Sequence, residues 1–204
     1  MGYASKDIRN ILVAGHAGCG KTTLTEALLY MSGASERMGR VEDGTTASDF
    51  DPEEIRRKAS LNSSVVPVEY EGIKYNLIDA PGLFDFETGA AEGIMAAESV
   101  LICVSGRSGV TVGAEKAYQL ALKNNKARMI FVTKADLENA DYFKILEQMK
   151  IKFGPQCLPL RRARSSGRRH RRLHQPVQPE GLQIRRRQAG PDRPARHRPP
   201  FLRA

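Results

Sequence analysis

The sequence has little of several features that would assign it to a specialised class of protein. It has no tryptophan and only three cysteines, Cys19, Cys103 and Cys157, which stand far apart. An odd, scattered set of this kind argues against a disulfide framework and favours a reducing compartment. No apolar run approaches the ~18 residues of a membrane span, and the start of the chain lacks the apolar core of a signal peptide. We therefore expect a soluble, cytoplasmic monomer with no membrane partner.

The charge is divided unevenly along the chain. The whole chain carries a net charge of +9, yet residues 1–150 hold 21 acidic and only 17 basic residues. Residues 161–204 contain 14 arginines, no lysine and a single aromatic residue, Phe201. Such a segment cannot bury enough apolar surface to offset its ordering entropy. The sequence thus predicts a mildly acidic folded body followed by a disordered basic tail rich in arginine and proline.

Within the body, short apolar runs alternate with segments of helical periodicity. The runs predict strands at 11–14, 64–70, 73–79, 100–104 and 129–132, with the first and last buried, and helices follow near 24–31, 90–97, 113–124 and 140–150. Residues 34–62 are polar and are interpreted as a long loop. This alternation predicts an α/β fold, a three-layer sandwich whose mostly parallel sheet is covered on both faces. Ligands of such folds bind at the carboxyl ends of the strands.

A phosphate-binding loop follows the first predicted strand. The residues Gly15, His16, Ala17, Gly18, Cys19, Gly20, Lys21 and Thr22 fit the pattern G-x-x-x-x-G-K-[ST], and Thr23 continues into the helix. Glycines let successive N–H groups face a polyphosphate, and the helix offers its positive end to the same anion. Lys21 would neutralise the phosphate oxygens, and the Thr22 hydroxyl would bind magnesium. An accidental glycine-rich turn would match less well, because a strand precedes the motif and a helix follows it.

A second motif, Asp79-Ala80-Pro81-Gly82, stands where another predicted strand ends. Asp79 would hold magnesium through water, and the Gly82 N–H would meet the γ-phosphate. The competing interpretation of Asp79 is a residue that caps a turn.

A third motif, Thr133-Lys134-Ala135-Asp136, follows the last strand. There Asp136 would accept both N–H donors on the edge of guanine while Lys134 lies over the base; the competing interpretation is a helix cap.

Taken together, these motifs resemble the GTPase domain of elongation factor G, the ribosomal translocase, and especially its divergent bacterial paralogues. The resemblance covers residues 6–159, including the stretches 43–46, 76–82, 104–115 and 132–142. It implies a P-loop NTPase fold, GTP or GDP and Mg²⁺ as ligands, and hydrolysis stimulated by the ribosome. It also implies catalytic roles for Lys21 and Gly82, and it places Ser60 at the switch-loop position that binds magnesium together with Thr22 and Asp79.

The sequence departs from this family at several positions. Thr133 stands where the family usually has asparagine, so the affinity for guanine is expected to fall. Gly18 replaces a phosphate-loop aspartate. Leu83 replaces the histidine that orients the attacking water, and an apolar side chain cannot do this. We expect slow hydrolysis with binding retained.

Other interpretations are set by the neighbourhood of the motifs and by the tail. His16 is interpreted as a packing residue, Cys19 as pointing away from phosphate, and the acidic run 49–54 as a solvated loop and not a metal site. The resemblance stops near residue 160, which divides the chain into an incomplete GTPase domain, 6–159, and the tail, 160–204. A frameshift would explain the tail. The rival hypotheses are an RNA-binding arm and a non-catalytic fragment that binds nucleotide weakly.

Overall fold

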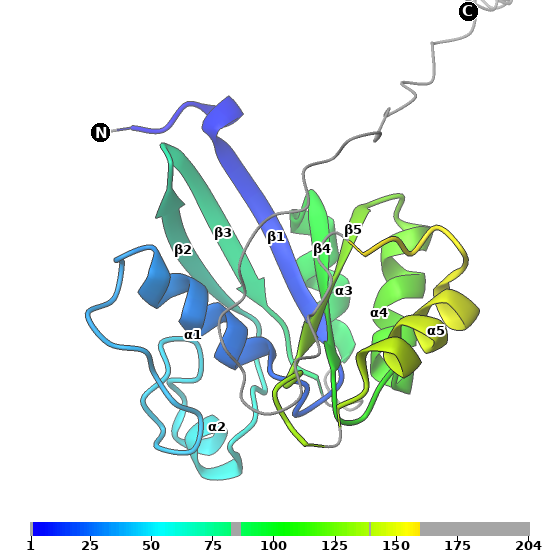
Figure 1. Cartoon of the computed structure of the whole chain (residues 1–204). Helices are drawn as coiled ribbons and strands as arrows, with labels where there is room; N and C mark the ends of the chain where they lie inside the picture. The colour runs from blue at the N-terminus through cyan, green and yellow to red at the C-terminus, as the bar shows by residue number, and fades with distance from the viewer. Residues whose placement is uncertain (1, 83–86, 139, 160–204) are drawn as a thin grey trace, which may run out of the picture.

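One five-stranded sheet forms the centre of the molecule in the computed structural model, which describes residues 2–82, 87–138 and 140–159 (Figure 1). The strands are β1 (Ile8–Gly15), β2 (Ser64–Tyr70), β3 (Ile73–Asp79), β4 (Ser99–Ser105) and β5 (Ala127–Thr133), in the order β2-β3-β1-β4-β5. All neighbours pair in parallel except β2 and β3, which are antiparallel. A tight turn at Glu71 and Gly72, both with positive φ, joins these two strands.

Helices cover both faces of the sheet, as the sequence predicts. The helices of the chain are η1 (Ser5–Asp7), α1 (Lys21–Met31), α2 (Pro52–Arg57), α3 (Glu87–Ala96), α4 (Val112–Lys123) and α5 (Tyr142–Phe153). Of these, η1 and α2 are short; η1 precedes β1, and α2 stands in the segment that connects α1 to β2. Helix α1 lies on one face, and α3, α4 and α5 lie on the other (Figure 1). Strand β1 is buried between the layers, with Leu12 packed on the α3–α4 side and Val13 on the α1 side. A strand covered on both faces needs a continuous apolar run, which is why Ile11 to Ala14 show no alternation. No helix in the described part of the chain is long and apolar enough to cross a bilayer.

The segment predicted as a long loop, 34–62, contains the short helix α2. Asp51 caps this helix: its carboxylate accepts from Glu53 N at 2.8 Å, and Glu54 accepts from Asp51 N at 3.2 Å. Pro52 occupies the first helical position, where its missing N–H costs nothing. The prediction of a loop was wrong here because six residues are too few to show an apolar period, whereas the reciprocal cap is what stabilises the turn.

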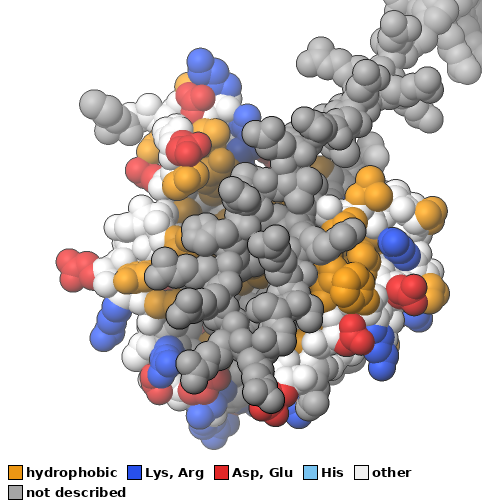
Figure 2. All heavy atoms as spheres, in the orientation of Figure 1, with side chains coloured by type: hydrophobic (Ala, Val, Ile, Leu, Met, Phe, Trp, Pro, Cys, Tyr) orange, Lys and Arg blue, Asp and Glu red, His pale blue; other side chains and the backbone are white. Residues whose placement is uncertain are grey.

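Strand β5 was predicted to be buried and is instead the edge of the described sheet. Ile130 and Val132 pack against the main core, but Met129 is 50% exposed and Phe131 is 39% exposed. Helix α1 packs mainly on β1, β2 and β3. Figure 2 accordingly shows hydrophobic side chains gathered on the surface at the β5–α5 side of the molecule. An apolar run therefore indicated a strand correctly and overestimated its burial.

Candidate nucleotide-binding site

The phosphate-binding motif forms a tight loop between β1 and α1. Gly15, Gly18 and Gly20 have φ values of +144°, +69° and +94°. Residues with a Cβ atom rarely adopt such positive φ values. Gly15 also has no room for a side chain, because a Cβ there would lie 2.6 Å from the carbonyl oxygen of Cys103. The loop thus turns at the N-terminus of α1, where the helix dipole and free N–H groups favour an anion.

Lys21 extends across this loop and is almost completely buried. Its ammonium donates hydrogen bonds to the carbonyl oxygens of Gly15 at 3.2 Å and of His16 at 3.1 Å. Gly82 lies directly against it: a Cβ on Gly82 would collide with Lys21 Nζ and would stand 2.7 Å from Ala17 N. The contact brings the second motif to the phosphate loop, so that Lys21 and the backbone of Gly82 face the same space.

Side chains that carry hydroxyl or carboxylate oxygens lie close together beside Lys21 at the end of β3. The hydroxyls of Thr22 and Ser60, which are 38 residues apart in sequence, lie 3.2 Å from each other. Asp79 is 1% exposed, and neither of its carboxylate oxygens makes a hydrogen bond of good geometry within the described residues. Burial raises the pKa of Asp79 to about 6, and the positive charge of Lys21 partly opposes this rise. The hydroxyls of Thr22 and Ser48 also lower this pKa, which places them beside the carboxylate, and a buried carboxylate beside hydroxyls fits a hard cation such as Mg²⁺.

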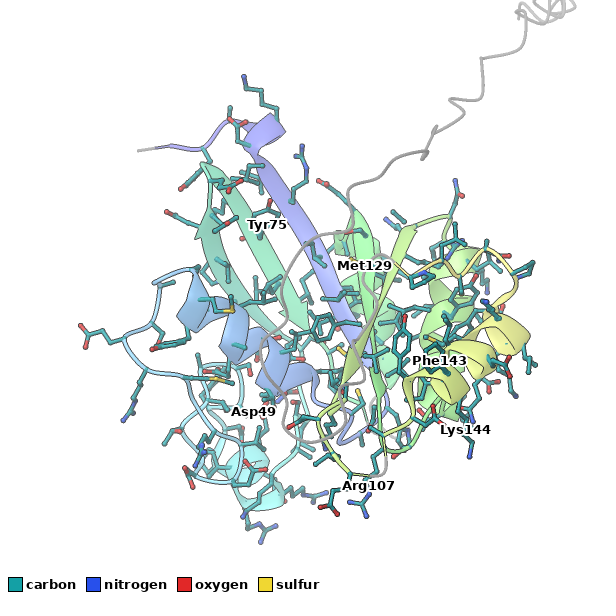
Figure 3. The ribbon with its side chains drawn as sticks, viewed as in Figure 1. Asp49, Tyr75, Arg107, Met129, Phe143 and Lys144 are labelled. Carbon is teal, nitrogen blue, oxygen red and sulfur yellow. The ribbon has the colours of Figure 1, made fainter. Side chains whose placement is uncertain are left out.

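Asp49 belongs to the same group of oxygens, although the sequence analysis placed it in a solvated loop. It is only 4% exposed, and burial raises its pKa while a hydrogen bond from the Ser60 hydroxyl lowers it. Figure 3 labels Asp49 among the loops that lie beside the first turn of α1. The prediction of a solvated acidic run was wrong because its members have different surroundings. Asp49 and Glu54 are buried, Asp51 caps α2, and Glu53 pairs with Arg56 and Arg57. Composition alone carries no signal that separates them.

The described residues contain no group of three or more histidine, cysteine or acidic side chains placed to hold a metal unaided. This agrees with the chemistry of Mg²⁺, which is commonly held by one or two protein carboxylates together with hydroxyls, waters and the phosphates of a nucleotide. Thr22 and Ser60 would supply the hydroxyls, with Asp79 and Asp49 close by. A bound Mg²⁺ there would neutralise charge on the phosphate oxygens that it contacts.

The third motif is tied to the phosphate loop by hydrogen bonds. The Thr133 hydroxyl donates to the carbonyl oxygen of Cys19 and, at 3.3 Å, to that of Val104. Lys134 Nζ donates to the Gly18 carbonyl at 2.9 Å, from a residue whose φ is +51°. Asp136 follows in an exposed turn at the same end of the sheet. These contacts fix the turn beside the phosphate loop, and Asp136 is an exposed residue of that turn.

The other side chains near the phosphate-binding loop either pack against neighbouring elements or are exposed. His16 packs against Gly113 at the start of α4, where a Cβ would lie 2.9 Å from His16 Cβ. The Cys19 thiol is buried in the core on the α1 side, in contact with Cys103, and so it points away from the phosphate position. Thr23 is exposed on the first turn of α1. Leu83 lies outside the described residues.

Comparisons with known proteins match this chain to translation factors. An elongation factor G-like protein of Mycobacterium tuberculosis is 37% identical over 153 residues, which cover 75% of this chain and 21% of that protein. The ribosome-releasing factor 2, mitochondrial, of Drosophila willistoni is 33% identical, over 76% of this chain and 21% of that protein. A crystal structure of a Thermus thermophilus protein matches with a TM-score of 0.70 and 44% identity, over 72% of this chain and 22% of that one.

The chain thus spans about a fifth of the length of the curated relatives that it matches. The model of the elongation factor Tu GTP binding domain matches residues 6–190, beyond the domain boundary that the sequence predicted at residue 159. That boundary stays a prediction. Because the family match covers most of the sequence, this chain belongs to the elongation factor Tu GTP-binding domain family.

Proposed function

We propose that the chain binds GTP with Mg²⁺ and hydrolyses it to GDP and phosphate, as the GTPase domain of an elongation factor G-like protein. The observation that carries this proposal is the convergence of motifs on one space: Lys21 lies against Gly82, and the carboxylate of Asp79 is buried beside Lys21 and the Thr22 hydroxyl. A family that binds GTP explains why these separate segments meet at the carboxyl ends of the strands.

Each residue has a role in this proposal. Lys21 stabilises charge on the β- and γ-phosphate oxygens, and the Gly82 N–H reads the presence of the γ-phosphate. Thr22 and Ser60 hold Mg²⁺ through their hydroxyls, and Asp79 and Asp49 orient its water shell. Asp136 accepts from the guanine edge and Lys134 covers the base. Thr133 supplies a hydroxyl in place of an amide, which supports weaker binding of guanine.

Hydrolysis is expected to be slow in isolation. Leu83 follows the γ-phosphate-sensing glycine, and a leucine side chain can neither accept a proton nor orient water. The names of the relatives, elongation factor G-like protein and ribosome-releasing factor 2, support the ribosome as the partner that stimulates the reaction. The arginine-rich tail would add a non-specific attraction to RNA.

Calorimetric titration of the full chain with GTP, GDP and ATP, with and without Mg²⁺, tests the proposal. Lys21→Ala should abolish binding of guanine nucleotides, and Lys150→Ala, an exposed lysine on α5 away from the loop, should leave it unchanged. A phosphate-release assay with and without ribosomes then separates a working GTPase from a fragment that only binds. Folded protein that takes up neither GTP nor GDP would refute the proposed function.

A further inference from the structure

Two glutamates hold the loop that carries Asp49 and Ser60, and both are buried without a cationic partner among the described residues. Glu26 projects from α1 and is 2% exposed. One of its carboxylate oxygens accepts a hydrogen bond from Gly39 N at 3.1 Å, and the other accepts from Ala47 N at 2.6 Å. The second bond fixes the backbone two residues before Asp49.

Glu54 holds the other end of the same loop. It is 1% exposed on α2, and one of its oxygens accepts from Leu61 N at 2.9 Å and from Asn62 N at 3.0 Å. Its second oxygen accepts from Asp51 N at 3.2 Å. Glu54 therefore fixes the backbone immediately after Ser60, and Glu26 fixes the backbone two residues before Asp49.

Both positions require a carboxylate and not merely a polar side chain. Each glutamate uses both of its oxygens as acceptors for backbone N–H groups. A glutamine of the same shape has one acceptor oxygen and one NH₂ donor, so one backbone N–H would face another donor and lose its partner. Gly39 is equally constrained, because a Cβ there would lie 2.5 Å from Glu26 Oε2.

The place of Glu26 on α1 relates these bonds to the magnesium site. Glu26 stands four residues after Thr22, so the two side chains lie on the same side of the helix, one turn apart. The helix that presents the Thr22 hydroxyl thus also anchors the loop that brings Ser60 to 3.2 Å from it. The anchoring fixes the separation between oxygens contributed by two distant segments.

We propose that Glu26 and Glu54 are positioning residues of the magnesium site, holding Asp49 and Ser60 against Thr22 and Asp79. This inference rests on the proposed function, because it concerns how tightly Mg²⁺ binds in the nucleotide site. Neither glutamate contacts the metal or the nucleotide in this scheme. Loss of such outer supports of a metal site lowers metal affinity by about 10- to 100-fold.

The test compares Glu26→Gln and Glu54→Gln in the full chain, with Glu36→Gln as the matched control. Glu36 is exposed in the same loop, so its substitution removes the same charge without removing an anchor. The Mg²⁺ concentration for half-maximal enhancement of GTP binding should rise about tenfold or more in both test variants and stay unchanged in the control. GDP affinity measured in EDTA should not change, because the phosphate loop is untouched.

A coupling experiment distinguishes positioning from general damage to the fold. In a Ser60→Ala background, Glu54→Gln should add little to the loss of Mg²⁺ affinity, because the group that it positions is already missing. An unchanged Mg²⁺ dependence in both glutamine variants, or an equal fall in GDP affinity in EDTA, would overturn the inference while leaving the proposed function intact. Unmodified chain that binds GTP with no effect of Mg²⁺ would overturn both.

Discussion

The Asp79 carboxyl group illustrates how burying a single residue of the proposed site affects the stability of the protein. Burial raises its pKa from 3.8 to about 6, so the folded protein holds the proton more tightly than the unfolded chain does. Its contribution to stability is therefore most favourable below pH 4, and it is lost as the pH rises through 6. The ionised form at neutral pH costs on the order of 3 kcal/mol when no metal is bound.

Asp79→Asn should consequently stabilise the metal-free protein at pH 8 and weaken its response to Mg²⁺. Thermal denaturation in EDTA from pH 4 to 8 measures this: the Tm of the variant should exceed that of the unmodified chain at pH 8, and the difference should shrink toward pH 4. Asp43→Asn, at an exposed position outside the proposed site, is the control. A variant less stable at pH 8 would show that Asp79 is satisfied by partners other than a cation.

Candidate site residues could be singled out from the sequence where a motif fixes both residue type and spacing. Lys21, Thr22 and Gly82 were singled out in this way, and the structure places Gly82 against Lys21, whereas the roles of these residues stay predictions. Asp49 and the two anchoring glutamates were not, because their roles depend on which backbone N–H groups the fold brings to them. Apart from Asp51, three residues before Glu54, those partners are 7 to 21 residues away, and no periodicity links them.

At the scale of elements, α2 shows how a local signal can outweigh a missing apolar pattern. The sequence Asp51-Pro52-Glu53-Glu54 already contains the acidic cap, the initial proline and the reciprocal glutamate of a helix start. Strands β2 and β3 matched their predicted bounds, 64–70 and 73–79, because a glycine turn separates two short runs that contain apolar and aromatic residues. Capping residues therefore predict a short helix better than the periodicity of its apolar residues does.

Asp51→Ala should destabilise the protein by about 1 kcal/mol, the usual cost of losing a side-chain N-cap. The substitution frees the N–H of Glu53, which now donates to the Asp51 carboxylate at 2.8 Å. Urea denaturation measures the change, with Asp43→Ala, an exposed residue of the same loop, as the control. Equal stability of the two variants would mean that α2 is held by the Glu54 contacts alone.

The exposed apolar face of β5 predicts that the protein self-associates through this strand. Met129 and Phe131 lie side by side on an edge strand, and edge strands with apolar side chains are prone to pair with other chains. Met129→Lys should lower the association measured by light scattering at raised protein concentration, with little change in Tm. Met31→Lys, at an exposed site on α1, is the control. Association unaltered by Met129→Lys would exclude this face as its cause.

For the whole molecule, the alternation of elements predicted the fold class but not the order of strands in the sheet. The central place of β1, between β3 and β4, follows from contacts between residues more than 60 positions apart. Nothing in a local pattern reports such pairing, although right-handed crossovers restrict the choices. The same limit explains β5: its apolar run gave the strand, and only the assembled sheet shows that Met129 and Phe131 are exposed there.

Charge separates the molecule into two parts with opposite expected behaviour. Residues 1–159 carry 18 basic and 21 acidic residues, whereas residues 160–204 carry 14 basic and 2 acidic ones. Deleting residues 160–204 should therefore abolish retention on a polyanion such as RNA, and the full chain should lose this retention steeply as salt rises. GTP affinity at about 150 mM salt should be the same for both proteins, since the three motifs all lie before residue 160. A fall in GTP affinity on deletion, measured by calorimetry, would show that the basic segment contributes to the nucleotide site and is more than an appended charge.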